Sequence, residues 1–218
     1  MIKMVDTKGR TFMAYFPFFM NIEGKRVLIV GGGRSALFKI KKLLSFGANL
    51  EVIALESLQE IKELEIKGKL CVKHHSFSEM DLIPIPFFVV IALEDKEENH
   101  KIAHLCKEKG ILVNVVDDPS YCDFYFPSLV TKGKCSIGIS TSGASPAIAG
   151  LLREQIEQLV SDQMEEIMDW LEQKRPELKE QFPTEKARKQ VIRMLYLACV
   201  EKQRILTKEE YELLIASL

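Results

Sequence analysis

Three successive glycines follow a run of four apolar residues in the segment Val27–Ala36, which reads VLIVGGGRSA. Four successive apolar residues predict a strand that is covered on both faces, as in a parallel sheet. Gly31, Gly33 and Ala36 occupy the three positions of the G-x-G-x-x-A motif, which joins such a strand to a helix and binds the diphosphate of a dinucleotide. The first glycine permits the tight turn, the second lets the diphosphate approach the backbone, and the small alanine lets helix and strand pack closely.

The residues around this motif alternate between β-branched apolar runs and amphipathic segments, which is typical of a parallel sheet with covering helices. Strands are expected at Arg26–Val30, Leu50–Ala54, Leu70–Lys73, Phe87–Ala92 and Ile111–Val116. Helices are expected from the apolar stripe that begins at Ala36, from the capping box of Ser57 and Glu60, and over Lys96–Lys109. Residues 1–116 are therefore predicted to form an α/β domain of the Rossmann type.

The character of the sequence changes after residue 116. Two short apolar runs, 124–131 and 135–140, flank the sequence Lys132-Gly133-Lys134 and predict a β-hairpin. The hairpin is expected to belong to a separate region, residues 117–145.

The remainder, residues 146–218, is predicted to form a small helical domain. Ser145 has the chemistry of an N-cap residue, and Pro146 suits the first helical position because the N–H that it lacks has no partner there. Further boundaries are expected at Pro176 and Pro183, which would separate helices, and at Thr207 with Glu210, which would cap the last one.

The charge balance argues against a protein that binds nucleic acid. The chain has 30 Lys and Arg residues against 31 Asp and Glu residues, and it lacks the basic clusters that neutralise phosphates. The five cysteines are scattered without a C-x-x-C pair, which indicates reduced thiols and a cytoplasmic location. The longest uncharged apolar stretch, Leu82–Leu93, is too short to span a bilayer, so no membrane association is expected. The run Phe12–Met20 contains Pro17 and is not expected to be a signal peptide.

Two carboxylates follow strands at the edge where ligands of open α/β sheets bind. Asp117 ends the fifth expected strand and would project toward the nicotinamide end of a cofactor, where a carboxylate can act as a general base. From spacing alone, a turn residue is the preferred interpretation of an Asp before Asp118-Pro119. Glu56, near the end of the second strand, suits the acid that holds the adenosine ribose and favours NAD over NADP. Arg34, beside the phosphates, could instead meet a 2′-phosphate or be a solvated side chain.

A polar cluster, Ser140–Pro146, precedes the first helix of the helical domain. Its hydroxyls could position a substrate, and its backbone could hold an anion at the helix start, while a plain helix-entry loop capped by Ser145 also explains it. Arg153, two turns into this helix, could meet an acidic substrate or be a solvated surface residue.

Four histidines raise the question of a metal site. His100 and His104 are spaced to share one helix face, but no third ligand of suitable spacing accompanies them. A surface helix without metal is the preferred interpretation.

Taken together, these ordered motifs resemble the precorrin-2 dehydrogenase family, which includes the N-terminal part of siroheme synthase. The resemblance covers most of the chain and rests on Tyr15-Phe16-Pro17, Asn21–Lys25, Val30–Gly33 with Ala36 and Lys39, Gly47-Ala48, Asn114–Asp117, Phe124–Ser128 and Ile139–Pro146. It implies a homodimer in which the region after the Rossmann domain mediates association.

For activity, the resemblance implies oxidation of the tetrapyrrole precorrin-2 to sirohydrochlorin, with NAD as hydride acceptor, in the synthesis of siroheme and in some organisms cobalamin. Asp117 matches the aspartate that is the family's proposed acid and base. The expected cofactor contacts are Gly31, Gly32, Gly33, Arg34, Ser35, Ala36, Leu55 and Glu56. The expected substrate contacts are Asn114, Ser128, Ser140, Thr141, Ser142 and Arg153, with Lys39, Lys132 and Lys134 as further basic candidates for the substrate carboxylates.

Several alternatives stay open at this stage. Some family members also insert iron into sirohydrochlorin, and Arg34-Ser35 replaces the small apolar residue that is usual after the glycines, which could change the cofactor preference. The 218 residues are too few to include the methyltransferase module of siroheme synthase, so methylation is not expected. The competing hypothesis is a non-catalytic module that senses NAD(H), which would need no base at Asp117.

Overall fold

The computed structural model describes residues 4–5, 11–12 and 15–217, and the chain divides into two compact units, one ending at Phe126 and the other beginning at Pro127. The three-part division expected from the sequence, with boundaries at residues 116 and 145, stays a prediction. At the N-terminus, β1 (Met4–Val5) and β2 (Thr11–Phe12) pair in antiparallel fashion, while residues 13 and 14 of the proline-containing apolar run lie outside the described residues.

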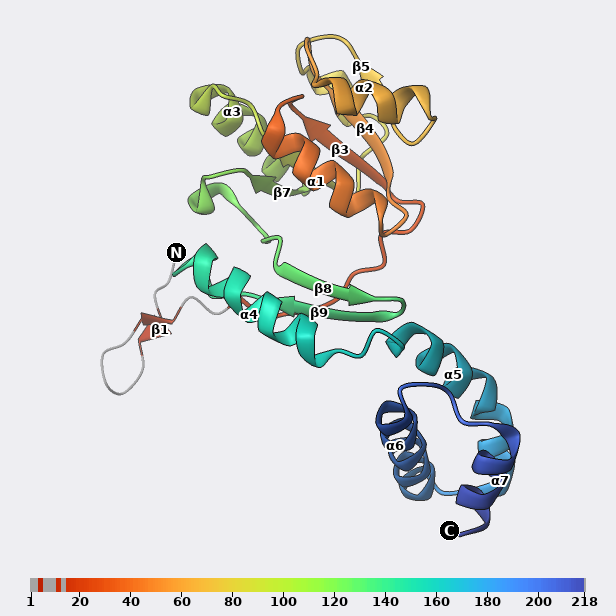
Figure 1. The fold of residues 1–218 in the computed structure, drawn as a ribbon. Helices are drawn as coiled ribbons and strands as arrows, with labels where there is room; N and C mark the ends of the chain where they lie inside the picture. The colour runs from red at the N-terminus through yellow and green to blue at the C-terminus, as the bar shows by residue number, and fades with distance from the viewer. Residues whose placement is uncertain (1–3, 6–10, 13–14, 218) are drawn as a thin grey trace. The chain divides into compact units, whose positions relative to one another are not determined.

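The first unit is built on a five-stranded sheet in which every neighbouring pair is parallel (Figure 1). Its strands are β3 (Arg26–Val30), β4 (Asn49–Ile53), β5 (Cys71–Lys73), β6 (Phe88–Ile91) and β7 (Leu112–Val115). The order across the sheet is β5-β4-β3-β6-β7, so the chain moves outward from β3 to β5 and then returns to β6 on the other side. The switch point therefore lies between β3 and β6, where open α/β sheets bind ligands outside the carboxyl ends of their strands.

Both faces of the central strand β3 are buried, as its four apolar residues predict. Val27 and Ile29 pack in one core with residues of α1 (Arg34–Leu44) and α2 (Gln59–Ile66). The alternate residues of the strand pack in a second core with α3 (Lys96–Glu108). Full burial of one such side chain stabilises the fold by roughly 1.5–3 kcal/mol. The Rossmann-like fold class is thus confirmed, with each strand within two residues of its expected position.

The start of α2 differs from the sequence prediction, in which Ser57 and Glu60 form a capping box. The helix begins at Gln59 with Leu58 as its N-cap residue, and no side chain in the described part of the chain caps it. A tertiary contact explains the shift, because the Leu58 backbone N–H donates a 3.0 Å hydrogen bond to the carbonyl of Gly32. This bond fixes the chain just before the helix, and the helix starts one residue beyond it.

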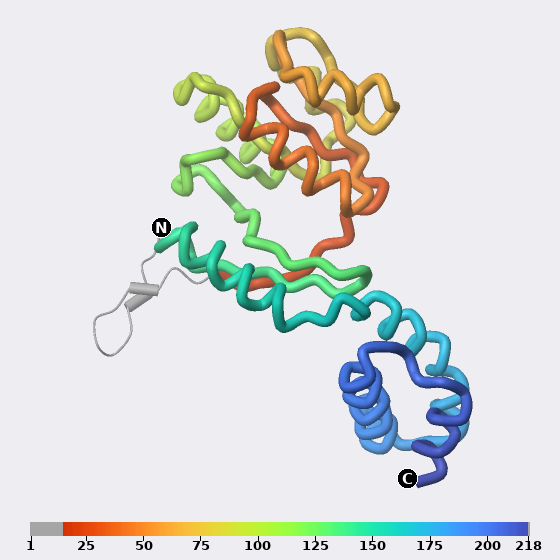
Figure 2. The backbone as a smooth tube through the Cα atoms, in the orientation of Figure 1, coloured from red at the N-terminus to blue at the C-terminus, as the bar shows by residue number. Residues whose placement is uncertain are grey.

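The second unit contains an antiparallel hairpin and four helices (Figure 1). The elements are β8 (Ser128–Lys132), β9 (Cys135–Ile139), α4 (Pro146–Leu159), α5 (Met164–Gln181), α6 (Glu185–Lys202) and α7 (Lys208–Ala216). Helix α4 lies along the hairpin, as the tube in Figure 2 also shows, and the last three helices share a core of their own. Among the described helices, none is both long and apolar enough to cross a bilayer.

The caps expected in this unit are confirmed, but one helix boundary is wrong. The Ser145 hydroxyl accepts the Ile148 N–H, and Thr207 forms a capping box with Glu210. Pro183 separates α5 from α6 as expected, whereas Pro176 lies inside α5 and does not interrupt it. The helix continues because residues on both sides of the proline, including Ile167 and Leu178, are buried in the core of the last three helices.

This arrangement predicts that Pro176→Ala stabilises the protein. The alanine restores a backbone N–H to the interior of α5 and relieves the clash of the proline ring with the preceding turn, so the free energy of unfolding should rise by about 1 kcal/mol or more. Urea denaturation followed by circular dichroism measures the change. Pro183→Ala is the matched control, because Pro183 lies between helices and its replacement should give no gain; equal stabilisation by both variants would contradict the explanation.

Candidate functional site

The glycine turn between β3 and α1 leaves no room for side chains at its first two positions. Gly31 has φ +122°, and a Cβ atom there would overlap the carbonyl oxygen of Ala92, just beyond β6. A Cβ atom on Gly32 would overlap the carbonyl oxygen of Glu56, beyond β4. The turn is therefore packed between the loops that follow the two neighbouring strands, and glycine is required at both positions.

Gly33 differs, because no atom in the described part of the chain lies within 4 Å of the position that its Cβ would take. Gly33 is the N-cap residue of α1, and no described side chain caps this helix. The first N–H groups of a helix have no partner within it, and together with the helix dipole they favour a bound anion. The open space beside Gly33 is where the sequence analysis expects a diphosphate to approach.

A cavity of about 230 Å³ lies next to the turn, at the carboxyl edge of the sheet. The glycine turn contributes Gly31 and Gly32, and the loop after β4 contributes Leu55 and Glu56. Four of the eight expected cofactor contacts therefore line one cavity. Of the others, Ala36 is buried against the sheet, while Gly33, Arg34 and Ser35 are exposed at the start of α1.

Sequence reasoning missed one side of this cavity, which is formed by His75, Ser76 and Phe77 after β5, with Leu93 and Glu98 beyond β6. These three residues directly follow a strand, which was the signal that could have marked them, but the sequence does not show that β5 neighbours β4.

Asn99 was also missed. Its side-chain amide accepts the Leu93 N–H at 3.2 Å and donates to the Leu93 carbonyl at 3.0 Å, which fixes the loop after β6.

Asp117 lies directly after β7 with an exposed side chain and a left-handed backbone, φ +60°. A residue with a side chain adopts this conformation at some cost, and such strain is common at functional sites. The preceding residue, Val116, donates its N–H to the carbonyl of Ile91 in β6 at 2.9 Å. Asp117 is thus held at the carboxyl edge of the sheet, as expected from the sequence.

The residues after Asp117 fasten the loop. The Asp118 carboxylate accepts hydrogen bonds from the Ser120 hydroxyl at 2.6 Å and from His100 Nε2 at 2.7 Å. The hydrogen bond from Ser120 is the main cause that holds the pKa of Asp118 below its usual value, and the bond from His100 adds to it. The carboxylate therefore stays ionised near neutral pH. The His100 ring stacks on Tyr121 with the ring centroids 3.9 Å apart.

The side chains of Cys122 and Asn114 also hold this loop. The Cys122 thiol donates to the carbonyl of Val115 at 3.1 Å, and burial raises the pKa of this thiol, so it stays protonated. The Asn114 side-chain amide is buried and donates to the carbonyl of Phe124 at 2.9 Å. Asn114, an expected substrate contact, therefore also has a place in the fold.

Lys39 on α1 provides positive charge near Asp117. Burial is the main cause that lowers the pKa of Lys39 and the neighbouring Lys42 adds to it, while the Asp117 carboxylate acts in the opposite direction. The Lys39 ammonium lies 4.3 Å from the centroid of the Phe126 ring, a cation–π distance.

The remaining expected residues belong to the second unit. Thr141 holds the turn before α4, since its hydroxyl accepts the Ser145 N–H at 3.3 Å and donates to the Ser145 carbonyl at 3.1 Å. Ser140 Oγ accepts the N–H of Ser142, whose φ is +53°. Ser128 begins β8.

The basic residues expected to bind carboxylates have acidic partners within this unit. Arg153 pairs with Glu157 at 2.5 Å and with Glu154 at 3.3 Å. Lys132 pairs with Asp162 at 2.6 Å, and Lys134 pairs with Asp169 at 2.9 Å and with Glu172. These ion pairs are exposed and therefore contribute little to stability.

Comparisons with known proteins add to this geometry. Residues 18–128 match the family described as putative NAD(P)-binding, and residues 132–159 match the central part of sirohaem biosynthesis proteins. Proteins named siroheme synthase from Nitrosococcus oceani and from Neisseria meningitidis serogroup C are 40% and 38% identical over 148 residues, which is 68% of this chain and 31% of each relative. The chain thus spans about a third of the length of these relatives. A solved structure of a protein named SirC, precorrin-2 dehydrogenase, matches 93% of this chain and 98% of its own with a TM-score of 0.67 at 26% identity.

The glycine turn generates a paired prediction. Gly33→Ala fits the fold, so its free energy of unfolding should change little, but the methyl group should weaken binding of NADH by about tenfold or more, because a charge-assisted hydrogen bond is worth roughly 1.5–3 kcal/mol. Gly31→Ala should instead lower the free energy of unfolding, because the alanine overlaps a backbone carbonyl and φ is positive. Thermal unfolding and fluorescence titration with NADH separate the two effects. Unchanged NADH affinity in a folded Gly33→Ala variant would contradict the expected phosphate position.

Proposed function

This chain belongs to the putative NAD(P)-binding family, and on that footing we propose that it oxidises precorrin-2 to sirohydrochlorin with NAD as the hydride acceptor. The observation that carries the proposal is the shared position of the open glycine turn, its cavity and Asp117 at the carboxyl edge of one sheet. The match to SirC over 93% of the chain supports the choice of substrate.

The described residues fit the proposed cofactor. The free start of α1 and the open space at Gly33 suit a diphosphate, and Glu56 lines the adjoining cavity, where its carboxylate can accept hydrogen bonds from ribose hydroxyls. A carboxylate there disfavours a 2′-phosphate, which supports NAD over NADP. We assign cofactor binding to the eight residues expected from the sequence, Gly31, Gly32, Gly33, Arg34, Ser35, Ala36, Leu55 and Glu56.

The chemistry divides between cofactor and protein. NAD, when bound, supplies the acceptor for the hydride, and the substrate carbon framework must also lose a proton. Asp117 takes this proton in the proposed mechanism, because its carboxylate is exposed and is held by a fastened loop at the carboxyl edge of the sheet. Lys39 places a positive charge near the same carboxylate.

Substrate binding is assigned to polar residues of the second unit, and Asn114 of the first unit is a separate candidate contact. The tetrapyrrole carries many carboxylates, and hydroxyl and backbone N–H groups before a helix bind such anions. Ser140, Thr141, Ser142 and Arg153 all lie within residues 132–159, which match the central part of sirohaem biosynthesis proteins. Ser128 lies just before this range.

The five cysteines are free, which suits a reducing, cytoplasmic setting.

The direct test is anaerobic incubation of the purified protein with precorrin-2 and NAD, followed by absorption spectroscopy. The expected result is the spectrum of sirohydrochlorin together with the 340 nm absorbance of NADH. A folded protein that binds NADH but leaves the spectrum unchanged would exclude the proposed reaction and favour the sensor hypothesis. Ferrous ion added after the reaction tests iron insertion.

Asp117→Asn tests the role of the carboxylate. Asparagine has the same size as aspartate and tolerates the left-handed backbone at this position, but it cannot take a proton. We therefore expect kcat to fall by about 10²–10⁴-fold, the usual contribution of general acid–base catalysis. Affinity for NADH should stay unchanged, because the cofactor contacts are elsewhere. Steady-state kinetics and fluorescence titration measure the two quantities, and an equal loss in both would point to a structural role instead.

A homodimer is part of the proposal, and the surface of α4 supports it. Ile148 and Leu151 are 54% and 55% exposed, and Leu159 is 84% exposed. Within the described part of the chain no third strand joins the hairpin beside α4, so the hairpin also presents backbone edges that a second copy can cover. An exposed apolar stripe next to exposed strand edges is typical of an interface between copies.

The double variant Ile148→Glu with Leu151→Glu should therefore sediment as a monomer where the wild type sediments as a dimer, because burying two carboxylates in an apolar contact is strongly unfavourable. Analytical ultracentrifugation measures the change. Leu213→Glu is the control, since Leu213 is as exposed but lies on α7. A dimer that survives the double variant would place the interface elsewhere.

A further inference from the structure

The cavity beside the glycine turn has a wall that no motif in the sequence marks. It is formed by His75, Ser76 and Phe77, which follow the edge strand β5. Phe77 is anchored by packing against the core beneath α3. His75 is half exposed, so its position depends on polar contacts rather than on burial.

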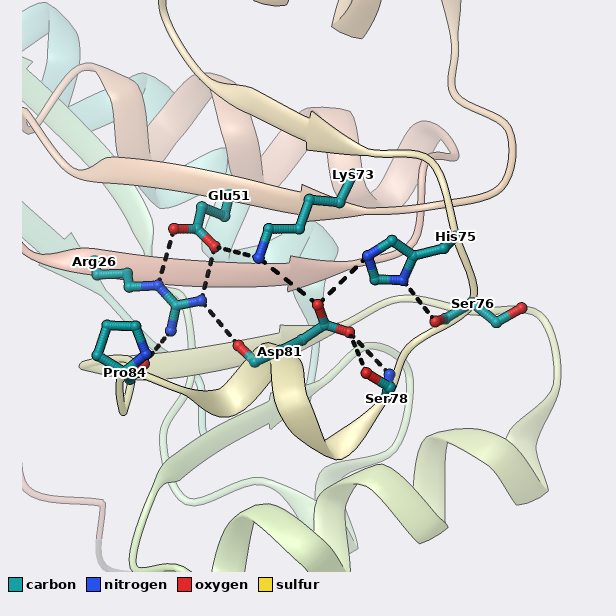
Figure 3. A network of polar contacts seen from close by, with 8 residues as sticks. All are labelled: Arg26, Glu51, Lys73, His75, Ser76, Ser78, Asp81 and Pro84. Carbon is teal, nitrogen blue, oxygen red and sulfur yellow. Dashed lines mark hydrogen bonds and ion pairs between the residues drawn. The ribbon is translucent and has the colours of Figure 1, made fainter.

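These polar contacts form the network in Figure 3, which has Asp81 at its centre. The Asp81 side chain is only 5% exposed, and its Oδ2 accepts the Ser78 N–H at 2.9 Å and the Ser78 hydroxyl at 3.2 Å. Its other oxygen, Oδ1, lies 3.5 Å from His75 Nε2 and 3.7 Å from Lys73 Nζ. A nearly buried carboxylate thus faces the wall of the cavity on one side and the sheet on the other.

The sheet holds this carboxylate in place. The Arg26 guanidinium binds both oxygens of Glu51, at 2.9 and 2.7 Å, and also donates to the backbone carbonyl of Asp81 at 2.8 Å (Figure 3). Hydrogen bonding from Arg26 is the main cause that lowers the pKa of Glu51, so this pair stays ionised. Lys73 joins Glu51, at 3.3 Å, to Asp81. The connection between β5 and β6 is therefore tied to two strands of the sheet.

The ring of His75 is oriented at both nitrogens. Nδ1 lies 2.9 Å from the carbonyl oxygen of Ser76, and Nε2 faces Asp81. Because an oxygen of the chain lies beside each nitrogen, a ligand in the cavity that His75 lines can use only the flat face of its ring. The acidic side chains that line the cavity, Glu56 and Glu98, are carboxylates, which repel phosphate but accept hydrogen bonds from an uncharged ligand.

We propose that His75 and Phe77 form the binding wall for the adenine ring of the dinucleotide, and that Asp81 is the positioning residue that holds His75 in place. This inference rests on the proposed dinucleotide binding and adds the residues that recognise the uncharged half of the cofactor. A purine stacks on flat side chains and makes no demand for positive charge, whereas the phosphates bind at the start of α1.

The test uses the full chain and ADP-ribose, which carries the adenosine and diphosphate of NAD without the nicotinamide. His75→Ala should weaken ADP-ribose binding by about tenfold in isothermal titration calorimetry, within the range for loss of one base stack. His75→Phe should restore the affinity to within about twofold, because a flat ring suffices for stacking. His74→Ala is the matched control, since His74 pairs with Glu65 and does not line the cavity. Affinity within twofold of wild type for His75→Ala would overturn the proposal.

Asp81 is tested as a positioning residue by a double-mutant cycle. Asp81→Asn should weaken ADP-ribose binding in the wild-type background but not in the His75→Ala background, because the carboxylate acts through the imidazole. A loss of equal size in both backgrounds would show a general structural role and would overturn the assignment. Failure of the wild type to bind ADP-ribose or NADH would reject the proposed function itself. This inference alone would be rejected if the wild type oxidised precorrin-2 normally and His75→Ala bound ADP-ribose with the affinity of the wild type.

Discussion

The rest of the first unit depends on the absence of side chains at Gly31 and Gly32. Because these positions carry only backbone, the carbonyl groups of Ala92 and Glu56 can lie directly against the turn. Backbone hydrogen bonds complete the contact, from Gly31 N–H to the carbonyl of Ile53 and from Leu58 N–H to that of Gly32. The turn thereby fixes the loops after β4 and β6, and these loops in turn define the cavity and the start of α2.

Three loops at the carboxyl edge are also fastened by polar side chains that lie outside the glycine motif. Asn99 holds the loop after β6, Asp118 holds the loop after β7, and Asp81 holds the connection after β5. A polar side chain that is bonded to backbone groups restricts a loop without filling the space in front of it. The loops at the edge of the sheet are consequently held in place while the space in front of them stays open, which pre-organises a binding site.

The second unit buries its apolar side chains less completely than the first. Its last three helices share a closed apolar core, whereas α4 packs on a two-stranded hairpin and leaves several large apolar side chains exposed. Ile148, Leu151 and Leu159 on α4 are exposed and belong to none of the apolar cores of the described residues. The same residues are therefore available for contact with another surface. In α5, by contrast, Pro176 is tolerated because residues on both sides of it are buried in the core of the last three helices.

The sequence by itself determined the strands, the glycine turn, the hairpin and the caps at Ser145 and Thr207, because each depends on periodicity or on residues within a few positions of one another. Of the residues that it names as cofactor contacts, four line one cavity, namely Gly31, Gly32, Leu55 and Glu56, and their role in cofactor binding stays a prediction. Only the tertiary structure decided that Leu58 rather than Ser57 is the N-cap residue of α2, that α5 runs through Pro176, and that His75–Phe77 complete the cavity. Such features arise from contacts between residues far apart in the chain, and these contacts exist only after the order of the strands has made particular loops neighbours.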